Sequence, residues 1–253
     1  MRGQSSGMGD RRAVAGRRVF SPYKTTHYSE LQWVKDGGLI GAILEMCGEG
    51  ERALEVGCGT GAMLRGLSQR YRECAGVEPS SQLLAEALAM PGVSYINKPF
   101  EELGWQEEFD CVLMRNVLHH LDTPADALAR VKGALRVGGR LVLCEGVPPC
   151  SAAVERYTAV FRCIDDRHIF TESDLVSLLH LAGLGDLVLR PYFMEGVDLL
   201  SWLRGVAPDQ ETYEKMLALH RQGDEAWRRA YQVSEGPTWY RMTWRWAIIV
   251  AVK

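Results

Sequence analysis

Three glycines stand at every second position directly after an apolar run, in the stretch "ALEVGCGTGAM" that begins at Ala53. Because Gly57, Gly59 and Gly61 lack a Cβ, the backbone there can adopt positive φ angles and let a ligand approach the main chain. A loop of this kind between a strand and a helix binds the middle of a nucleotide. The first question is therefore which nucleotide the loop holds.

Two ligand classes fit the glycine spacing. The letters "GCGTGA" satisfy the dinucleotide pattern at Gly57, Gly59 and Ala62, which leaves NAD and FAD open. The alternative is S-adenosylmethionine, whose sulfonium and ammonium groups are positively charged. Glu55 precedes the loop, and its carboxylate would accept hydrogen bonds from an ammonium group but repel a pyrophosphate. Glu78 ends the next expected strand and would bind the ribose hydroxyls of either ligand.

The elements that position these residues alternate between strand and helix. Up to residue 146 we expect strands at 52–56, 74–79, 93–97, 109–116 and 139–146, with helices at 62–71, 80–88 and 125–135. This alternation predicts a parallel sheet with helices on both faces. Further on we expect a helix at 172–183, strands at 186–193 and 242–252, and a helical insertion at about 196–237.

The length of 253 residues is enough for one domain with a single large core. Residues 1–18 are rich in Arg, Gly and Ser and are expected to form a disordered leader. We expect residues 19–253 to form the single domain, with N-terminal helices at 19–48, a cofactor-binding core at 49–147 and a substrate-side half at 148–253.

Composition argues against several classes of partner. There are 29 Lys and Arg against 32 Asp and Glu, which offers no basic excess for nucleic acid. No apolar run reaches the roughly 18 residues of a membrane span. The seven cysteines are scattered, odd in number and without a C-x-x-C pair, so we expect reduced thiols and a cytoplasmic protein.

Four motifs occur in order between about residues 50 and 146: "LEVGCGTG", "GVEPS", "FDCVLMRNVLHHL" and "ALRVGGRLVL". Together they resemble the class I S-adenosylmethionine-dependent methyltransferases, especially the small-molecule branch with the quinone-biosynthesis and natural-product enzymes. The resemblance implies a Rossmann-like, doubly wound, mostly parallel α/β sheet of seven strands. It also implies that the last strand is antiparallel, that a helical cap covers the substrate, and that S-adenosylmethionine is converted to S-adenosylhomocysteine.

The resemblance also implies roles for individual residues. Pro99 occupies the position where the family usually has an Asp that meets the adenine, so Phe100 would offer its backbone N–H and ring to the base instead. The methionine part of the cofactor would be held by Glu55, Gly57, Cys58, Gly59 and Gly61. Glu78 would hold the ribose, with Pro79 beside the adenine, and Arg115 and Asn116 would lie under the methionine near the methyl group. Tyr28 would close over the cofactor.

Three histidines are candidates for a general base. His119 and His120 follow the fourth strand, and because adjacent side chains diverge we expect at most one to face the site, with His120 favoured; a purely structural role is the alternative. His168 lies before a helix that Thr171 is expected to cap. The nearby "DDRH" suggests a solvated turn, so no metal is expected. Trp202 and Trp227 would line the acceptor pocket or belong to the core.

These observations predict a cytoplasmic methyltransferase, monomeric or homodimeric. It would transfer a methyl group by SN2 displacement to an oxygen, nitrogen or carbon of a small molecule, such as a secondary metabolite or quinone-like ring. Neither nucleic acid nor membrane is an expected partner. Two alternatives stay open at this point: an NAD-binding Rossmann oxidoreductase, and a non-catalytic binding protein with the methyltransferase fold.

Overall fold

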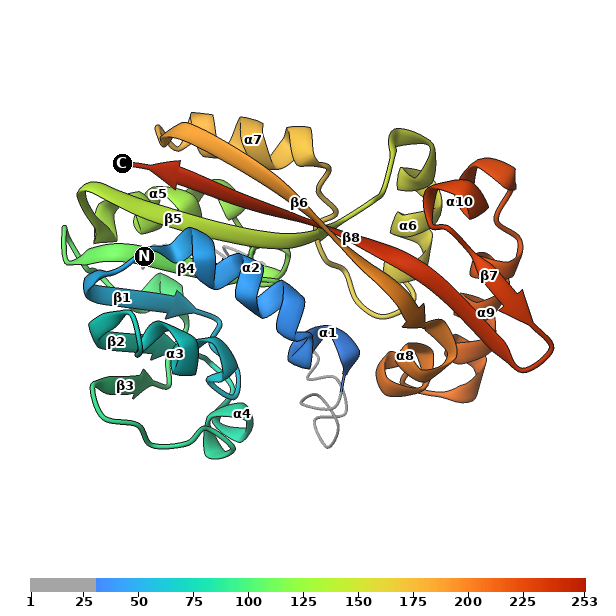
Figure 1. Cartoon of the computed structure of the whole chain (residues 1–253), viewed down its shortest axis with the longest axis horizontal. Coiled ribbons are helices and arrows are strands. Elements are labelled where there is room, and N and C mark those ends of the chain that lie inside the picture. The colour runs from blue at the N-terminus through green and yellow to red at the C-terminus, as the bar shows by residue number, and fades with distance from the viewer. Residues whose placement is uncertain (1–30) are drawn as a thin grey trace, which may run out of the picture.

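The structure, a computed structural model, describes residues 31–253 (Figure 1). The expected leader at 1–18 and Tyr28 lie outside the described residues. Helices and strands alternate up to the fifth strand, as the sequence predicts. They are α1 (Gln32–Lys35), α2 (Gly37–Cys47), β1 (Gly50–Val56), α3 (Ala62–Leu67), β2 (Tyr71–Val77), α4 (Ser81–Ala85), β3 (Val93–Ile96), β4 (Phe109–Arg115), α5 (Pro124–Ala134) and β5 (Leu135–Val147).

The second half of the chain adds helices around two long strands. Figure 1 shows β6 and β8 running past the end of the other strands, where α6, α8, α9, α10 and β7 gather. The elements are α6 (Val154–Phe161), α7 (Glu172–Leu181), β6 (Gly185–Asp198), α8 (Leu199–Val206), α9 (Gln210–Arg221), α10 (Glu225–Ala230), β7 (Ser234–Gly236) and β8 (Trp239–Val252). The expected helical insertion therefore comprises three helices and a short strand.

All strands belong to one sheet with the order β3-β2-β1-β4-β5-β8-β6, and β7 pairs with the far end of β8. The first five strands pair in parallel, whereas β8 is antiparallel to both β5 and β6. This confirms the Rossmann-like sheet with an antiparallel last strand, and β7 is an eighth strand beyond the expected seven. Among the described residues, no helix combines the length and apolar character that crossing a bilayer requires.

Two hydrophobic layers cover the two faces of the sheet. Residues of α2, α3 and the insertion helices pack on one face, and residues of α5 and α7 pack on the other. The period of two in β8 divides its side chains accordingly: Trp246 and Ile248 face the first layer, and Ala247 and Ile249 face the second. The expected alternation in this strand is confirmed.

Several expected boundaries differ from the observed ones. The helix expected over 62–71 ends at Leu67, because Tyr71 already belongs to β2 and its hydroxyl donates to the backbone oxygen of Cys47 at 2.5 Å. Helix α6 was not expected. The expected cap at Thr171 is confirmed, because its side chain accepts from the backbone N–H of Asp174 in a capping box.

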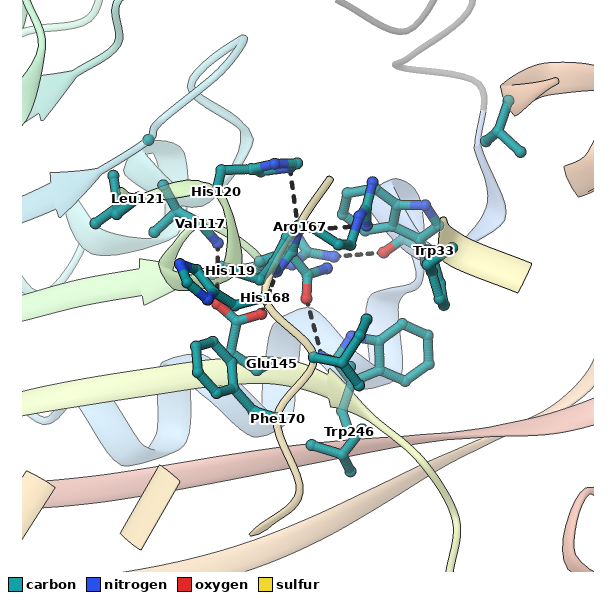
Figure 2. Close-up of a pocket in the computed structure, with 18 of the residues that line it drawn as sticks. Trp33, Val117, His119, His120, Leu121, Glu145, Arg167, His168, Phe170 and Trp246 are labelled. Atoms are coloured by element: carbon teal, nitrogen blue, oxygen red, sulfur yellow. Dashed lines mark hydrogen bonds and ion pairs between the residues drawn. The ribbon is translucent and has the colours of Figure 1, made fainter. Parts of the chain in front are cut away.

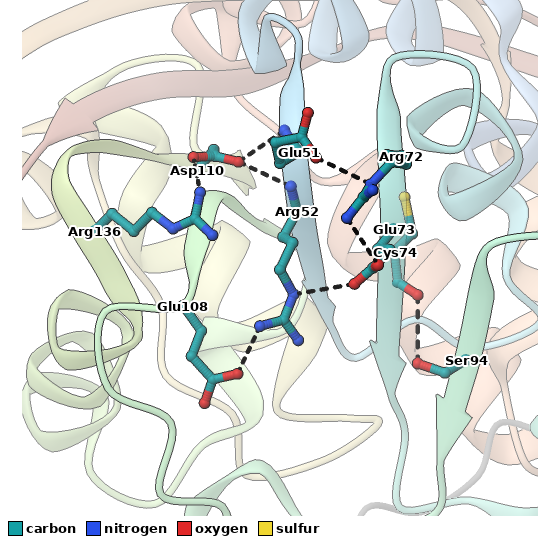
Figure 3. Close-up of polar contacts among 9 residues, drawn as sticks. All are labelled: Glu51, Arg52, Arg72, Glu73, Cys74, Ser94, Glu108, Asp110 and Arg136. Carbon is teal, nitrogen blue, oxygen red and sulfur yellow. Dashed lines mark hydrogen bonds and ion pairs between the residues drawn. The ribbon is translucent and has the colours of Figure 1, made fainter.

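A network of charged side chains ties together the amino-terminal ends of β1, β2 and β4 (Figure 3). Asp110 Oδ2 accepts from the backbone N–H groups of Glu51 and Arg52, both at 2.8 Å, and Oδ1 accepts from Arg136 at 2.8 Å. Although burial alone would raise it, these hydrogen bonds hold the pKa of Asp110 below its ordinary value. Asp110 therefore joins β4 to β1 at the edge opposite the glycine loop.

We expect Asp110→Ala to lower the free energy of unfolding by about 1–2 kcal/mol, because it removes the acceptor of two backbone N–H groups. The matched control is Glu108→Ala, which breaks only the half-exposed ion pair with Arg52 and should cost less than about 0.5 kcal/mol. Because the folded pKa of Asp110 is depressed, its contribution is present above about pH 4 and disappears below it. Urea denaturation at several pH values measures this; equal effects of the two variants would contradict the assignment.

Candidate active site

The glycine loop follows β1 and requires glycine at two positions. Gly57, Gly59 and Gly61 have φ angles of 70°, 54° and 77°, in the left-handed region. A Cβ on Gly57 would lie 2.5 Å from Val117 Cγ2, and one on Gly61 would lie 2.7 Å from the Tyr95 hydroxyl. The loop is therefore packed closely against β3 and against the segment that follows β4.

The N–H groups of this loop are bonded within the protein. Gly57 and Cys58 both donate to the carbonyl oxygen of the last residue of β2, at 2.8 and 3.1 Å. Gly61 donates to the Cys58 oxygen at 2.8 Å, and Gly59 donates to Glu78 Oε2 at 3.1 Å. A loop whose N–H groups are used in this way is not a cradle for a pyrophosphate, which needs donors aimed at it.

A cavity of about 600 Å³ opens beside the loop, at the carboxyl ends of the parallel strands. Its first half is lined by seven of the residues predicted to bind the cofactor, namely Gly57, Gly59, Glu78, Pro79, Phe100, Arg115 and Asn116. The remaining three described ones, Glu55, Cys58 and Gly61, do not line it. Ligands of open α/β sheets bind at this edge, so this cavity is the candidate cofactor site.

Glu55 lies behind the loop and is only 3% exposed. Its Oε2 atom is buried without a hydrogen-bond partner. Burial raises the pKa of Glu55 to about 8, with the Arg115 guanidinium acting in the opposite direction. Cys58 is also turned inward, where its Sγ packs against Gly76. The Cys58 side chain therefore does not line the cavity.

Aromatic side chains wall the second half of the cavity. Trp202 and Trp227 both line it, as do Tyr231 and Trp244. Trp202 makes an edge-on contact with Trp244 at 5.1 Å between ring centroids, and the buried His220 lies between Trp202 and Trp227. Burial lowers the pKa of His220 to about 4, so this imidazole is neutral at pH 7. This half suits a flat apolar ligand.

Both adjacent histidines line the cavity, so the expectation that at most one would face the site was wrong (Figure 2). Residues 118–120 form a 3-10 turn, which brings the rings of His119 and His120 within 4.1 Å between centroids. His119 Nδ1 lies 2.5 Å from Glu145 Oε2, and His119 Nε2 lies 3.0 Å from His120 Nε2. His168 also lines the cavity.

Comparison with known proteins agrees with this geometry. Residues 54–143 match the family described as "Methyltransferase domain". A tRNA U34 carboxymethyltransferase of Shewanella sp. (strain ANA-3) is 37% identical over 98 residues, which cover 36% of this chain and 30% of that protein. The aligned part of the chain thus spans less than a third of that relative's length.

Two solved structures share the fold. The YcgJ protein from Bacillus subtilis is 18% identical with a TM-score of 0.76, covering 85% of this chain and 97% of that one. Phosphoethanolamine N-methyltransferase 2 from Haemonchus contortus, solved with S-adenosylhomocysteine, is also 18% identical with a TM-score of 0.60, covering 95% of this chain and 60% of that one. Residues 54–143 thus match a methyltransferase domain, and the chain shares the fold of these two structures.

The residues beside the glycine loop fit S-adenosylmethionine, the cofactor that the resemblance implies. Glu78 is 6% exposed at the cavity wall, and burial raises the pKa of its carboxyl, although Ser80 and Gly59 donate N–H groups to it. A carboxylate has about four acceptor sites, so it can still accept two ribose hydroxyls. Glu55 lies behind the loop and does not line the cavity, so of these two glutamates Glu78 is the one that can meet a ligand there. A carboxylate at the wall suits a positively charged ligand.

Arg115 and Asn116 are largely engaged within the protein. The Arg115 guanidinium donates to the backbone oxygens of Trp33 and Val34 and lies over the Trp33 ring. Asn116 has a positive φ of 52°, and its Oδ1 accepts from the backbone N–H of Gly146 at 3.2 Å. Arg115 and Asn116 therefore hold α1 and the end of β5 against the cavity. Trp33 is the aromatic residue of α1 that lines the cavity, and Tyr28 lies outside the described residues.

Two charged residues of the methyltransferase site were missed in the sequence. Glu145 is 1% exposed and accepts from the backbone N–H groups of Val117 and Leu118 at 3.1 and 2.8 Å. Arg167 forms a two-point ion pair with Asp165 at 2.6 Å and lies 3.4 Å from His119 Nε2. A signal for Glu145 existed, because it is the charged residue that ends the buried run "LVLC". Arg167 carried no comparable signal.

We expect Gly57→Ala to lower the free energy of unfolding by about 1–3 kcal/mol, because alanine is strained at φ 70° and its Cβ would meet Val117. The control Gly37→Ala begins α2, where a Cβ meets nothing within 4 Å, and should be neutral or stabilising. Chemical denaturation compares the two. If Gly57→Ala is as stable as the control, the loop does not have this conformation.

Proposed function

We propose that the protein transfers a methyl group from S-adenosylmethionine to a small molecule held in the aromatic half of the cavity. The observation that carries the proposal is the continuity of one cavity from the glycine loop and Glu78 to Trp202 and Trp227. Donor and acceptor can therefore lie in one enclosed space. S-adenosylmethionine supplies a methyl group on a positively charged sulfur, which an acceptor displaces in line.

The hydrogen bonds of the loop support S-adenosylmethionine over a dinucleotide. The N–H group of Gly59 is bonded to Glu78, and those of Gly57 and Cys58 are bonded to the end of β2. A pyrophosphate would meet carboxylates instead of donors, whereas a sulfonium or ammonium group is attracted by them. This is the reason to prefer the methyltransferase reading over an NAD-dependent oxidoreductase, which the glycine spacing alone permits.

The size and lining of the cavity support a small acceptor. Methyl transfer requires the nucleophile, the methyl carbon and the sulfur to be held in line with water excluded. Helices α6, α8, α9 and α10 supply Phe161, Trp202, His220 and Trp227 to the wall, and these side chains would hold and dehydrate a flat ring. The matched relatives are tRNA enzymes by name, but this chain carries a formal net charge of -3 and spans only part of them.

The acceptor class is tested by transfer of a radiolabelled methyl group from S-adenosylmethionine. The purified protein is offered a panel of small aromatic hydroxyl and amine compounds in parallel with bulk tRNA. We expect label in one or more small compounds and none in tRNA above the level of a heat-inactivated control. Label in tRNA alone would overturn the small-molecule assignment, and the relatives would then be the better guide.

Glu78 is proposed to hold the ribose. We expect Glu78→Gln to weaken the affinity for S-adenosylhomocysteine about 5- to 30-fold, because one of the carboxylate's acceptors is replaced by a donor in a buried site. The control Glu86→Gln changes an exposed carboxylate at the end of α4 that does not line the cavity, and should leave the affinity unchanged. Isothermal titration calorimetry measures both. Equal affinity of Glu78→Gln and the wild type would refute the assignment.

A further inference from the structure

Three titratable side chains in the wall of the cavity form a continuous chain. Glu145 lies at the buried end, His119 in the middle and His120 at the other end. Their contacts are 2.5 Å from Glu145 Oε2 to His119 Nδ1 and 3.0 Å from His119 Nε2 to His120 Nε2 (Figure 2). Both distances are within the range of hydrogen bonds, so the three groups can exchange protons.

The contacts allow only two arrangements of protons in which both histidines are neutral. With Glu145 ionised, His119 carries its proton on Nδ1 and His120 carries its proton on Nε2, which points at His119 Nε2. With Glu145 protonated, the chain is reversed: Nε2 of His119 donates to His120, which carries its own proton on Nδ1. The two arrangements differ by a single proton: it enters at His120 Nδ1, one proton shifts across each of the two contacts, and Glu145 is left protonated.

We propose that Glu145, His119 and His120 form a proton relay that removes a proton from the acceptor at His120 and stores it on Glu145. The inference rests on the proposed function for the identity of the acceptor: the aromatic wall indicates a flat ring, and the relay requires that this ring bear a hydroxyl group. His120 is the catalytic base of this relay, because it lies at the end of the chain in the cavity wall, whereas both ring nitrogens of His119 contact Glu145 and His120. His119 and Glu145 are positioning residues that act through it.

The chemistry of the step balances without a further reactant. The O–H bond of the acceptor breaks and its proton passes to His120. His120 passes a proton to His119, and His119 passes a proton to Glu145. The oxygen forms the bond to the methyl carbon, and the electron pair of the broken carbon–sulfur bond stays on sulfur. Return of the proton through His119 and His120, after the product has left, restores the first arrangement.

The charges around the relay favour a proton on the carboxyl over one on an imidazole. Burial raises the pKa of Glu145 to about 8. It lowers the pKa of His120 to about 2 and that of His119 well below its ordinary value, and the Arg167 guanidinium 3.4 Å from His119 acts in the same direction. Asp165 opposes this effect but is held by Arg167 at 2.6 Å.

The remaining groups around the relay do not reverse this preference. His168 faces His119 and further disfavours its charged form. The backbone N–H groups of Val117 and Leu118 donate to Glu145, which moderates the rise in its pKa. Neither imidazole is thus a stable resting place for a second proton near neutral pH, whereas Glu145 is.

Nitrogen NMR of the histidine rings tests the relay without any ligand, because it distinguishes the two neutral tautomers from the imidazolium form. We expect both His119 and His120 to change tautomer together as the pH rises through about 8, with neither becoming doubly protonated between about pH 6 and about pH 9. An imidazolium form of either residue in that range, or tautomers that do not change, would overturn the proposal.

Two matched variants locate the stored proton. In Glu145→Gln the tautomers should no longer change with pH. In Glu55→Gln, which alters the other buried glutamate with a pKa raised to about 8, the change should persist. A tautomer change that survives in Glu145→Gln would place the proton elsewhere. Once an acceptor is known, Glu145→Gln should lower kcat about 100-fold and abolish its rise towards pH 8.

Failure of this inference can be separated from failure of the proposed function. Calorimetry with S-adenosylhomocysteine on the wild type tests cofactor binding alone, whereas the tautomer titration tests the relay alone. Binding without the tautomer change would leave a methyltransferase that uses no relay, as an amine acceptor permits, and would refute the inference only. A tautomer change without binding would refute the proposed cofactor and leave the relay intact.

Discussion

The hydrogen bond from the backbone N–H of Gly59 to the Glu78 carboxylate joins the end of β1 to the end of β2. Because Glu78 also accepts from Ser80 at the start of α4, one buried carboxylate organises both sides of the nucleotide-binding edge. The same contact removes the donor that a pyrophosphate would need. The shape of the loop and its choice of ligand therefore depend on one interaction.

Buried carboxylates at the strand ends give the site its electrostatic character. Glu55, Glu78 and Glu145 end or nearly end β1, β2 and β5, and burial raises the pKa of each. Burial of a carboxylate is unfavourable unless hydrogen bonds or a positive charge compensate for it. The backbone N–H groups compensate at Glu78 and Glu145, and the Arg115 guanidinium acts in this direction at Glu55.

The part of the site built from backbone could be predicted from the sequence. The glycine spacing and the alternation of strands and helices predicted the loop and the parallel sheet, and most of the residues predicted to bind the cofactor, Glu78 included, line one cavity. These features depend on local geometry, because glycine permits a positive φ and the carboxyl ends of parallel strands share one edge.

The part built from long-range contacts could not be predicted. The pairing of Glu145 with His119 joins residues 26 positions apart, and that of Arg167 with His119 spans 48. The divergence of adjacent side chains suggested that one of His119 and His120 would turn away, but the 3-10 turn brings both to the cavity. Glu55 and Cys58 lie in the expected segment, yet their side chains are directed into the core.

The most direct test of the central claim is the thermal stability of the wild-type protein with S-adenosylhomocysteine, S-adenosylmethionine, NAD and FAD in parallel. A ligand that binds the native state raises the melting temperature by mass action. We expect an increase with the two adenosyl amino acids and none with either dinucleotide. An increase with NAD or FAD alone would contradict the account, because it would require donors in the loop that the structure has already bonded to Glu78 and β2.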